Sequence, residues 1–201
     1  MPAESKPSPR RFVDLRTGVH SHWISACAAL MLALIILAAG ASVAGAPPGN
    51  LELTTTAFQP GGAIPTQFTC SGENISPALA WNQPPPRTQS IVLIVDDPDA
   101  PAGTWVHWVV FNLPASARRL PERIPTGDSV AGGGTQALND FHQNGYGGPC
   151  PPPGKPHRYF FRLYALDTVL NPRTPVHRKD VDAAMKGHVL AQGELMGMFR
   201  R

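Results

Sequence analysis

The sequence predicts a β-dominated domain with helix only at its periphery. Four short apolar runs have the length and the β-branched or aromatic content of strands. The chain contains 23 Pro and 19 Gly, and segments rich in both separate these runs and would break any helix across them. Beyond residue 46, helical spacing of apolar residues occurs only near the C-terminus. We therefore expect an all-β-dominated fold with peripheral helices.

Residues 1–46 have the composition of a signal peptide or a signal anchor. No charged residue occurs from Trp23 to Ala46, and four Lys/Arg precede that stretch. Small residues after the apolar run allow cleavage after Ala41 or Ala46, and the uncleaved stretch is long enough to span a bilayer. A pair of arginines at 10–11 leaves the twin-arginine export route open. Either way we expect an exported domain, periplasmic or extracellular, with residues 23–46 anchoring it to the inner membrane if they are retained.

Residues 47–201 form the expected folded domain. About 150 residues are enough for one domain with a sizeable core. Strands are expected at 51–58, 91–95, 106–112 and 159–166. A helix is expected over 180–190, where acidic residues stand at the start and apolar residues follow at helical spacing, and Gly193 is expected to end or interrupt it.

The charge balance gives little support to a nucleic-acid partner. The calculated pI is about 9.0, but four of the seventeen Lys/Arg precede the apolar stretch. Beyond Ala46, thirteen Lys/Arg face twelve Asp/Glu, so the domain is nearly neutral. No basic stripe with interleaved aromatic residues is visible. We expect no nucleic-acid binding.

Two carboxylates and a histidine lie between two of the predicted strands. Asp97 and Asp99 fall on the connection after 91–95, and His107 is near the start of the next strand. Loops held by rigid strands commonly carry binding groups. His157 and Tyr159 alternate at the start of the last predicted strand, so their side chains share a face. This pattern indicates a binding site.

Four motifs in order resemble those of one protein family. They read T-C-S-G-E-N-I-S-P-A-L-A-W at 69–81, D-P-D-A-P at 97–101, W-V-H-W at 105–108 and G-G-P-C-P-P-P-G-K-P-H-R-Y at 147–159. Together they resemble the phosphatidylethanolamine-binding protein family, in particular its bacterial Raf-kinase-inhibitor-like branch. The resemblance extends from about Leu51 to the C-terminus.

The resemblance implies a fold and a pocket. The fold would be an antiparallel β-sandwich, in which a large central sheet packs on a smaller one, with peripheral helices and a cis Ala100–Pro101 bond. The small pocket would accept phosphate, phosphoryl groups or phospholipid headgroups, without a cofactor or metal and without catalysis. The expected ligand-binding residues are Asp97, Asp99, Trp105, His107, Cys150, Pro151, Pro152, His157 and Tyr159.

Carboxylates in an anion pocket require a reason. Asp97 and Asp99 could hydrogen-bond to the histidines or to loop amides, or accept from a headgroup ammonium, while imidazole donates to phosphoryl oxygens. Binding would then strengthen as pH falls. A plainer interpretation is that the two aspartates only hold a turn around Pro98. Taken alone, His107 would more often be an interior histidine than a ligand contact.

The exported domain retains two cysteines, Cys70 and Cys150. Two cysteines in an oxidising compartment suggest one disulfide, although the sequence does not show that they meet. Exported members of the family carry cysteines at both places, and the resemblance thus implies the Cys70–Cys150 pair. A catalytic Cys150 with His157 as its base is the alternative.

Two other functional classes remain open. Relatives inhibit kinases or proteases, so this chain could act through a protein interface; export makes a cytosolic kinase target improbable. A metal-dependent hydrolase, in which Asp97, Asp99, His107 and His157 hold the ion, is less favoured because no familiar hydrolase motif is present. Val106 replaces a second polar residue expected beside the pocket histidine, which favours a small anion over a whole phospholipid.

Overall fold

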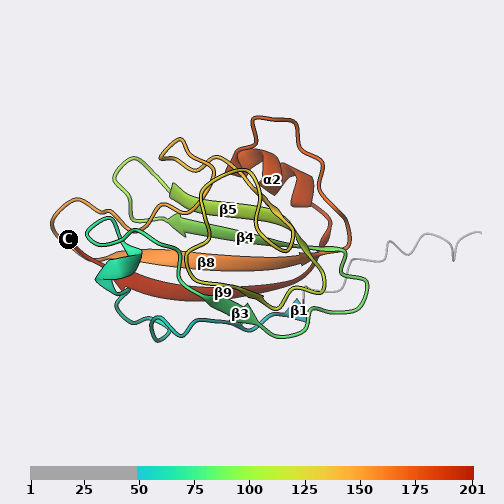
Figure 1. Cartoon of the computed structure of the whole chain (residues 1–201), viewed down its shortest axis with the longest axis horizontal. Coiled ribbons are helices and arrows are strands. Elements are labelled where there is room, and N and C mark those ends of the chain that lie inside the picture. The colour runs from blue at the N-terminus through green and yellow to red at the C-terminus, as the bar shows by residue number, and fades with distance from the viewer. Residues whose placement is uncertain (1–48) are drawn as a thin grey trace, which may run out of the picture. The chain divides into compact units, whose positions relative to one another are not determined.

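A six-stranded sheet carries most of the fold (Figure 1). In the computed structural model, which describes residues 49–201, its strand order is β1-β9-β8-β4-β5-β7. Strands β4, β5, β8 and β9 are long and antiparallel to their neighbours in this group. The bounds are β1 Gly49–Asn50, β4 Ser90–Asp97, β5 Trp105–Pro114, β7 Thr135–Gln136, β8 His157–Leu166 and β9 Val189–Phe199.

A three-stranded sheet packs on one face of the large sheet. Its strands are β2 (Leu53–Thr54), β3 (Leu79–Trp81) and β6 (Arg119–Leu120), and a 3-10 helix, η2, covers Thr66–Phe68. The main core lies between the sheets, because Ile91, Leu93 and Val95 of β4 cluster there with residues of β3. Side chains alternate along a strand, so Asp97 follows Val95 on this same face.

The helix α2 (Arg178–Met185) covers the opposite face of the large sheet. Val181 and Met185 of the helix pack with Val92 and Ile94 of β4 in a second apolar cluster. These two β4 residues alternate with those of the main core. Strand β4 is therefore buried on both faces, which explains its unbroken apolar run.

A buried ion-pair network ties this helix to the sheet. The side chain of Asp96 points to the helix face, is buried, and accepts from the guanidinium groups of Arg162 on β8 and Arg178 on α2. Arg162 also pairs with Glu194, and Arg178 with Asp182. Each charge of the pairs at Asp96 thus has a partner of opposite sign, as buried charges require.

The expected β-sandwich with a larger and a smaller sheet is confirmed, with two corrections to its strands. The large sheet is mixed rather than wholly antiparallel, because β1 pairs with β9 in parallel. The predicted strand 51–58 is reduced to Leu53–Thr54, since the chain leaves the small sheet after two residues. The other three predicted strands are confirmed as β4, β5 and β8, each somewhat longer than expected.

The predicted helix 180–190 was placed too late and made too long. It covers Arg178–Met185 and gives way to a turn at Gly187, whose φ is +85°, a value that favours glycine. Residues from Val189 onward form β9. Gly193 therefore lies inside a strand and does not end the helix. Only glycine fits at this position, because a Cβ there would be 2.0 Å from the carbonyl oxygen of Leu51.

Two further expectations have outcomes here. The Ala100–Pro101 bond is trans, and the cis bond found among residues 49–201 is Thr174–Pro175, so the expected cis peptide was wrong. In the same range no helix is long and apolar enough to cross a membrane. The signal or anchor segment and its cleavage sites lie outside the described residues.

Candidate functional site

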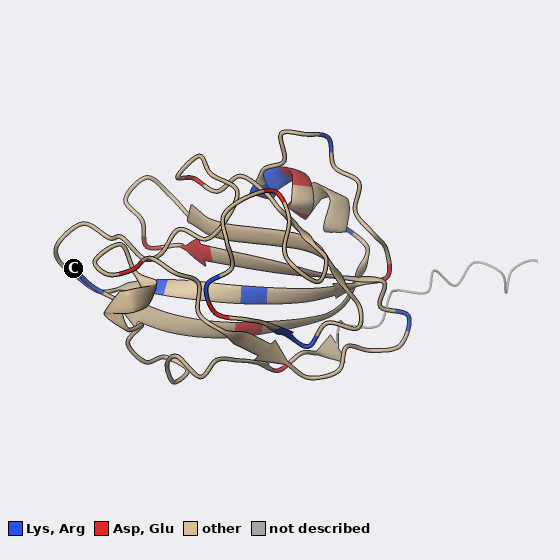
Figure 2. Ribbon diagram, viewed as in Figure 1, with Lys and Arg blue, Asp and Glu red and all other residues tan. Residues whose placement is uncertain are grey.

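The candidate site lies where three neighbouring strands begin or end. Strand β4 ends at Asp97, and its antiparallel neighbours β5 and β8 begin at Trp105 and His157. Because adjacent antiparallel strands place the end of one beside the start of the next, these residues meet at one edge of the sheet (Figure 1). The acid-bearing end of β4 is visible in Figure 2.

A cavity of about 200 Å³ opens at this edge. Seven of the nine expected ligand-binding residues line it, and Asp99 and Tyr159 do not. The lining residues are Asp97, Ala100, Pro101, Trp105, His107, Phe141, Cys150, Pro151, Pro152 and His157. No Lys or Arg is among them. Sequence segments that are about 60 residues apart are thereby brought to one small cavity.

Asp97 both shapes a turn and pairs with a histidine. One of its oxygens, Oδ1, accepts the backbone N–H of Asp99 at 2.8 Å, which is an Asx turn. The other, Oδ2, lies 2.8 Å from Nδ1 of His157. The carboxylate is buried, with 4% of its side chain exposed. Asp97 therefore holds the turn and also lies in the wall of the cavity.

Asp99 points away from the cavity. Its carboxylate accepts from the backbone N–H of Arg158 at 2.9 Å and from the guanidinium at 2.9 and 2.6 Å. The hydrogen bonds from the Arg158 side chain lower the pKa of Asp99 to about 2. Asp99 thus fixes the start of β8 beside the turn and does not line the cavity.

His107 is the extra residue of a β-bulge. Val95 pairs with Trp108 and Asp96 pairs with Val106, so no β4 residue lies opposite His107. A bulge re-aims a side chain, and here it turns the imidazole toward the cavity. The ring is 2% exposed, and its Nδ1 lies 2.6 Å from the carbonyl oxygen of Gly147. Burial lowers the pKa of His107 below its ordinary value.

Phe141 forms a wall of the cavity that the sequence analysis did not predict. Its ring stands edge-on to Trp105 and to His107, with centroids 5.4 and 5.3 Å away. A Cβ at position 147 would be 2.4 Å from the ring, so Gly147 is needed for this packing. Phe141 lies in a loop with no strand pattern of its own and was not among the expected ligand-binding residues.

Asn139 holds the loop that carries Phe141. Its Oδ1 accepts the backbone N–H groups of Phe141 and Gln143, at 2.9 and 3.2 Å. Its Nδ2 donates to the carbonyl oxygen of Gly145 at 2.9 Å and to that of His107 at 3.3 Å. Asn139 is 3% exposed, so this buried amide connects the loop to the bulge on β5.

The proline-rich wall is fastened to the first motif by a disulfide. Cys70 and Cys150 are bonded, as the family resemblance implied, with their Cα atoms 5.3 Å apart. Cys70 also donates its N–H to the carbonyl oxygen of Pro149 at 3.1 Å, and Gly148 donates to Oδ1 of Asn74 at 2.7 Å. Because Cys150 is oxidised in this pair, it has no thiolate with which to act as a nucleophile.

Two hydrogen-bond donors at the site are buried without a partner among the described residues. They are Nε1 of Trp105 and the hydroxyl of Tyr159. The Tyr159 ring stands edge-on to His107, with centroids 5.2 Å apart, and burial raises the pKa of its hydroxyl. Buried polar groups are normally paired, so these two donors are exceptions among residues 49–201.

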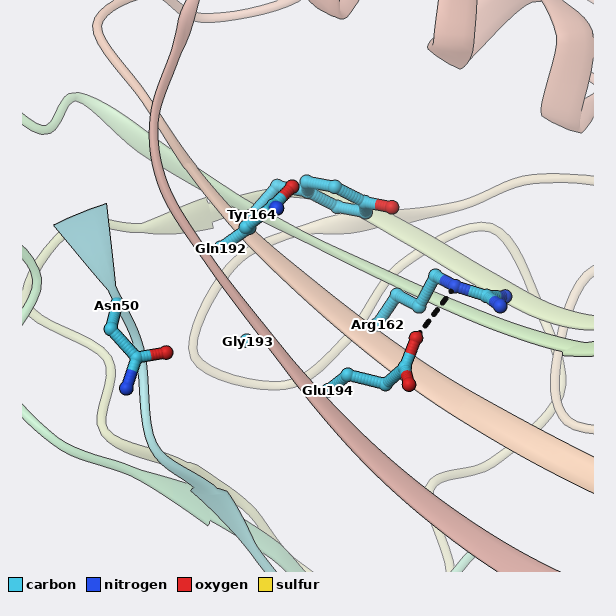
Figure 3. A pocket seen from close by; sticks show the side chains of 6 residues that line it. All are labelled: Asn50, Arg162, Tyr164, Gln192, Gly193 and Glu194. Atoms are coloured by element: carbon cyan, nitrogen blue, oxygen red, sulfur yellow. Dashed lines mark hydrogen bonds and ion pairs between the residues drawn. The ribbon is translucent and has the colours of Figure 1, made fainter. Parts of the chain in front are cut away.

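A second cavity, of about 330 Å³, lies on the other face of the sheet (Figure 3). Arg162 and Tyr164 of β8 line it together with Asn50 and residues 192–194. The guanidinium of Arg162 is already paired with Glu194 at 3.1 Å and with the buried Asp96. The second cavity is therefore a less favourable anion site than its arginine suggests.

Within 49–201, no three His, Cys, Asp or Glu residues are grouped as metal ligands.

The fold and the site define a β-sandwich protein with a small cavity at the strand ends. Residues 54–200 match the family model described as phosphatidylethanolamine-binding protein. The chain therefore belongs to the phosphatidylethanolamine-binding protein family.

Relatives with similar sequences and structures extend this result. A UPF0098 protein of Methanothermobacter thermautotrophicus is 50% identical over 151 residues, which are 75% of this chain and 99% of the relative. A crystal structure from Chlamydia trachomatis, described as a putative phosphatidylethanolamine-binding protein homolog, is 39% identical with a TM-score of 0.68. Escherichia coli YbcL, described as a new member of the mammalian family, is 32% identical with a TM-score of 0.69. Each structure is covered to 99% by 76% of this chain.

These coverages also define the folding unit. The three relatives consist almost wholly of the matched region, and residues 49–201 here fall in one compact unit. Among these relatives a chain of this length occurs without a counterpart of the N-terminal segment, which is the reason to study residues 47–201 by themselves.

Proposed function

We propose that residues 47–201 form an exported, non-enzymatic binding domain whose pocket receives a phosphoryl group, either as free phosphate or as part of a phospholipid headgroup. One observation carries the proposal: residues from three separate motifs converge on one cavity, and the His157–Asp97 pair lies in its wall. The domain would modulate a partner protein according to whether the pocket is filled.

The size of the cavity favours a small group. Pockets for drug-sized ligands are about 300–1000 Å³, and this one is about 200 Å³. A phosphoryl group with a short substituent is a better match than a whole phospholipid. The apolar surfaces of Trp105, Phe141 and the prolines would pack against the substituent.

The polar groups support an anion in spite of the carboxylate. Asp97 already accepts one hydrogen bond on each oxygen, so part of its charge is met within the protein. Nε1 of Trp105, a buried donor in the lining, has no partner among residues 49–201 and would donate to a phosphoryl oxygen. Outside the cavity, the guanidinium of Arg201 lies 3.7 Å from the sulfur of Cys150, where it would attract an approaching anion.

Export is proposed from two features. An uncharged apolar stretch at 23–46 follows a basic segment, as in signal peptides and anchors. The Cys70–Cys150 disulfide is of the kind that persists in oxidising compartments. The domain would therefore meet its ligand in the periplasm or outside the cell.

The test is a calorimetric titration of the 47–201 domain with phosphate and with phosphoethanolamine, at pH 6 and pH 7.5. We expect saturable binding that is stronger at pH 6 and is lost in His157→Ala. The chain offers a matched control, because His188 pairs with Asp167 through Nδ1 at the same 2.8 Å but on the surface. His188→Ala should bind as the wild type does.

The two ligands also separate the two sources of the phosphoryl group. Tighter binding of phosphoethanolamine would favour a headgroup, whose ammonium can pair with Asp97, and equal binding would favour free phosphate. If neither ligand binds to the folded domain, the phosphoryl proposal is wrong. Equal losses in His157→Ala and His188→Ala would show that the cavity is not the binding site.

A further inference from the structure

The hydrogen bond of His107 determines which of its ring nitrogens carries a proton. Nδ1 lies 2.6 Å from the carbonyl oxygen of Gly147. A carbonyl oxygen only accepts, so Nδ1 must be the donor and bear the hydrogen. The ring is 2% exposed, and such burial favours the neutral imidazole. In a neutral ring with Nδ1–H, the other nitrogen Nε2 is a bare acceptor.

This acceptor belongs to the cavity. His107 is one of the lining residues, and the hydrogen bond of its ring that holds it to the neighbouring loop is made by Nδ1. Nδ1 is occupied by the loop, so Nε2 is the polar atom of the ring that remains for a ligand. The expectation that this imidazole donates to phosphoryl oxygens does not agree with this geometry.

The rest of the lining also has more acceptors than donors. The ionised carboxylate of Asp97 only accepts. Residues 149–153 are all prolines except Cys150, so this wall offers several carbonyl groups and a single backbone N–H. Nε1 of Trp105 is the unpartnered side-chain donor of the lining. A fully deprotonated phosphoryl group, which only accepts, would leave Nε2 of His107 facing an oxygen lone pair.

We propose that the pocket selects a phosphomonoester in its singly protonated form, with the P–OH group donating a hydrogen bond to Nε2 of His107. This inference rests on the proposed function and specifies its ligand. The remaining phosphoryl oxygens accept from the donors at the site. His107 is then a specificity-determining residue, because it distinguishes a phosphoryl group that carries a proton from an anion that does not.

Other titratable groups lie around His107, and their effects must be separated from that of the ligand's own proton. They are Asp96 and Asp97 from β4, Asp140 from the loop of Phe141, and His157 and Tyr159 from β8. If His157 became protonated, its positive charge would strengthen the binding of any anion, whether or not that anion has a proton to donate. A probe anion that never carries a proton is therefore the necessary comparison.

Methyl phosphate and methyl sulfate provide this comparison. At pH 5 both are monoanions of similar size and shape, and only methyl phosphate has a hydroxyl proton. We expect the 47–201 domain to bind methyl phosphate about tenfold more tightly than methyl sulfate at pH 5, the effect of one good hydrogen bond. The affinity for methyl phosphate should fall about tenfold per pH unit above its second pKa of about 6. The weak affinity for methyl sulfate should not follow this profile.

The variant His107→Asn tests the named atom. Asparagine can still donate from its amide to the carbonyl oxygen of Gly147, but it places no acceptor where Nε2 was. We expect its affinities for the two probes to become nearly equal. Long-range ¹H–¹⁵N NMR spectra of the wild type provide a readout that needs no variant, and they should show Nδ1–H with a bare Nε2 at the pH of the binding measurements.

Each outcome decides the matter. Equal affinities for methyl phosphate and methyl sulfate, with the same dependence on pH, would overturn the inference and leave the proposed anion pocket in place. The inference would also be overturned if NMR showed His107 as an imidazolium, or with its proton on Nε2, near pH 6. If neither methyl phosphate, phosphate nor phosphoethanolamine binds at any pH, the inference and the proposed function fail together.

Discussion

Removing the Cys70–Cys150 disulfide should cost stability but leave the pocket largely intact. The bond joins residues 80 positions apart. The entropy of closing a loop of that length corresponds to about 4.5 kcal/mol at 25 °C, and measured losses are typically about 2–4 kcal/mol. We expect the free energy of unfolding of Cys70→Ser/Cys150→Ser to be lower than that of the wild type by about 2–4 kcal/mol. That is a large fraction of the total of about 5–15 kcal/mol for a typical domain.

The pocket should survive because other bonds hold the same wall. The N–H of Cys70 donates to the carbonyl oxygen of Pro149 at 3.1 Å, and the N–H of Gly148 donates to Asn74 at 2.7 Å. The buried hydroxyl of Tyr146 donates to the carbonyl oxygen of Phe68 at 2.7 Å. None of these contacts needs the sulfur atoms. We therefore expect the affinity for phosphoethanolamine to change by no more than about threefold, which is less than 1 kcal/mol.

Urea unfolding followed by tryptophan fluorescence measures the first quantity, and calorimetry measures the second. The m-value should rise in the variant, because the unfolded chain without the cross-link is less compact. Wild-type domain under reducing conditions serves as the control and should match the variant. A stability loss below about 1 kcal/mol would refute the argument from loop closure. A folded variant with no binding would show that the disulfide itself shapes the pocket.

Two further predictions concern the sheet and its rim. Gly193→Ala should lower the free energy of unfolding by about 1–3 kcal/mol through overpacking against the carbonyl oxygen of Leu51, as urea unfolding can measure. Gly49→Ala is the tolerated control, because its Cβ would meet its nearest atom at 3.5 Å. Equal effects of the two substitutions would contradict this reasoning. Asp99 should titrate near pH 2 in carboxyl NMR spectra and return toward 3.8 in Arg158→Gln. Because its folded-state pKa is depressed, the pair stabilises the fold above about pH 4 and this contribution disappears as pH falls toward 2; an unchanged pKa in Arg158→Gln would contradict the assigned cause.

The long central strands were predictable because their burial is visible in the sequence. Strand β4 is buried on both faces, so it reads as an unbroken apolar run. Strand β8 is rich in aromatic residues, and its buried positions alternate with less buried ones from Tyr159 to Ala165. Strand β9 could not be recognised in the same way. Gly193 and Gly197 lie in it because other chain segments approach closely, and glycine in a sequence normally argues against a strand.

Most residues of the cavity lining could be named from the sequence, but the direction of each side chain could not. The D-P-D-A-P motif indicated both aspartates, yet Asp97 turns into the cavity and Asp99 turns out to Arg158. Alternation along a strand does not apply beyond its end, so the sequence contains no signal for this difference. Phe141 was missed for a related reason, since its position depends on the loop that Asn139 holds.

The bulge at His107 connects the fold to the chemistry of the pocket. Without it, regular alternation would place His107 and Trp108 on opposite faces of β5, yet Trp108 belongs to the main core and His107 lines the cavity at its end. The same displacement brings Nδ1 within hydrogen-bond distance of the Gly147 carbonyl and thereby fixes the proton on that nitrogen. One extra residue in a strand therefore sets both the direction of the imidazole and the atom that it offers to a ligand. A recognition site that depends on an acceptor follows from the register of β4 and β5, and it could not have been derived from the presence of a histidine alone.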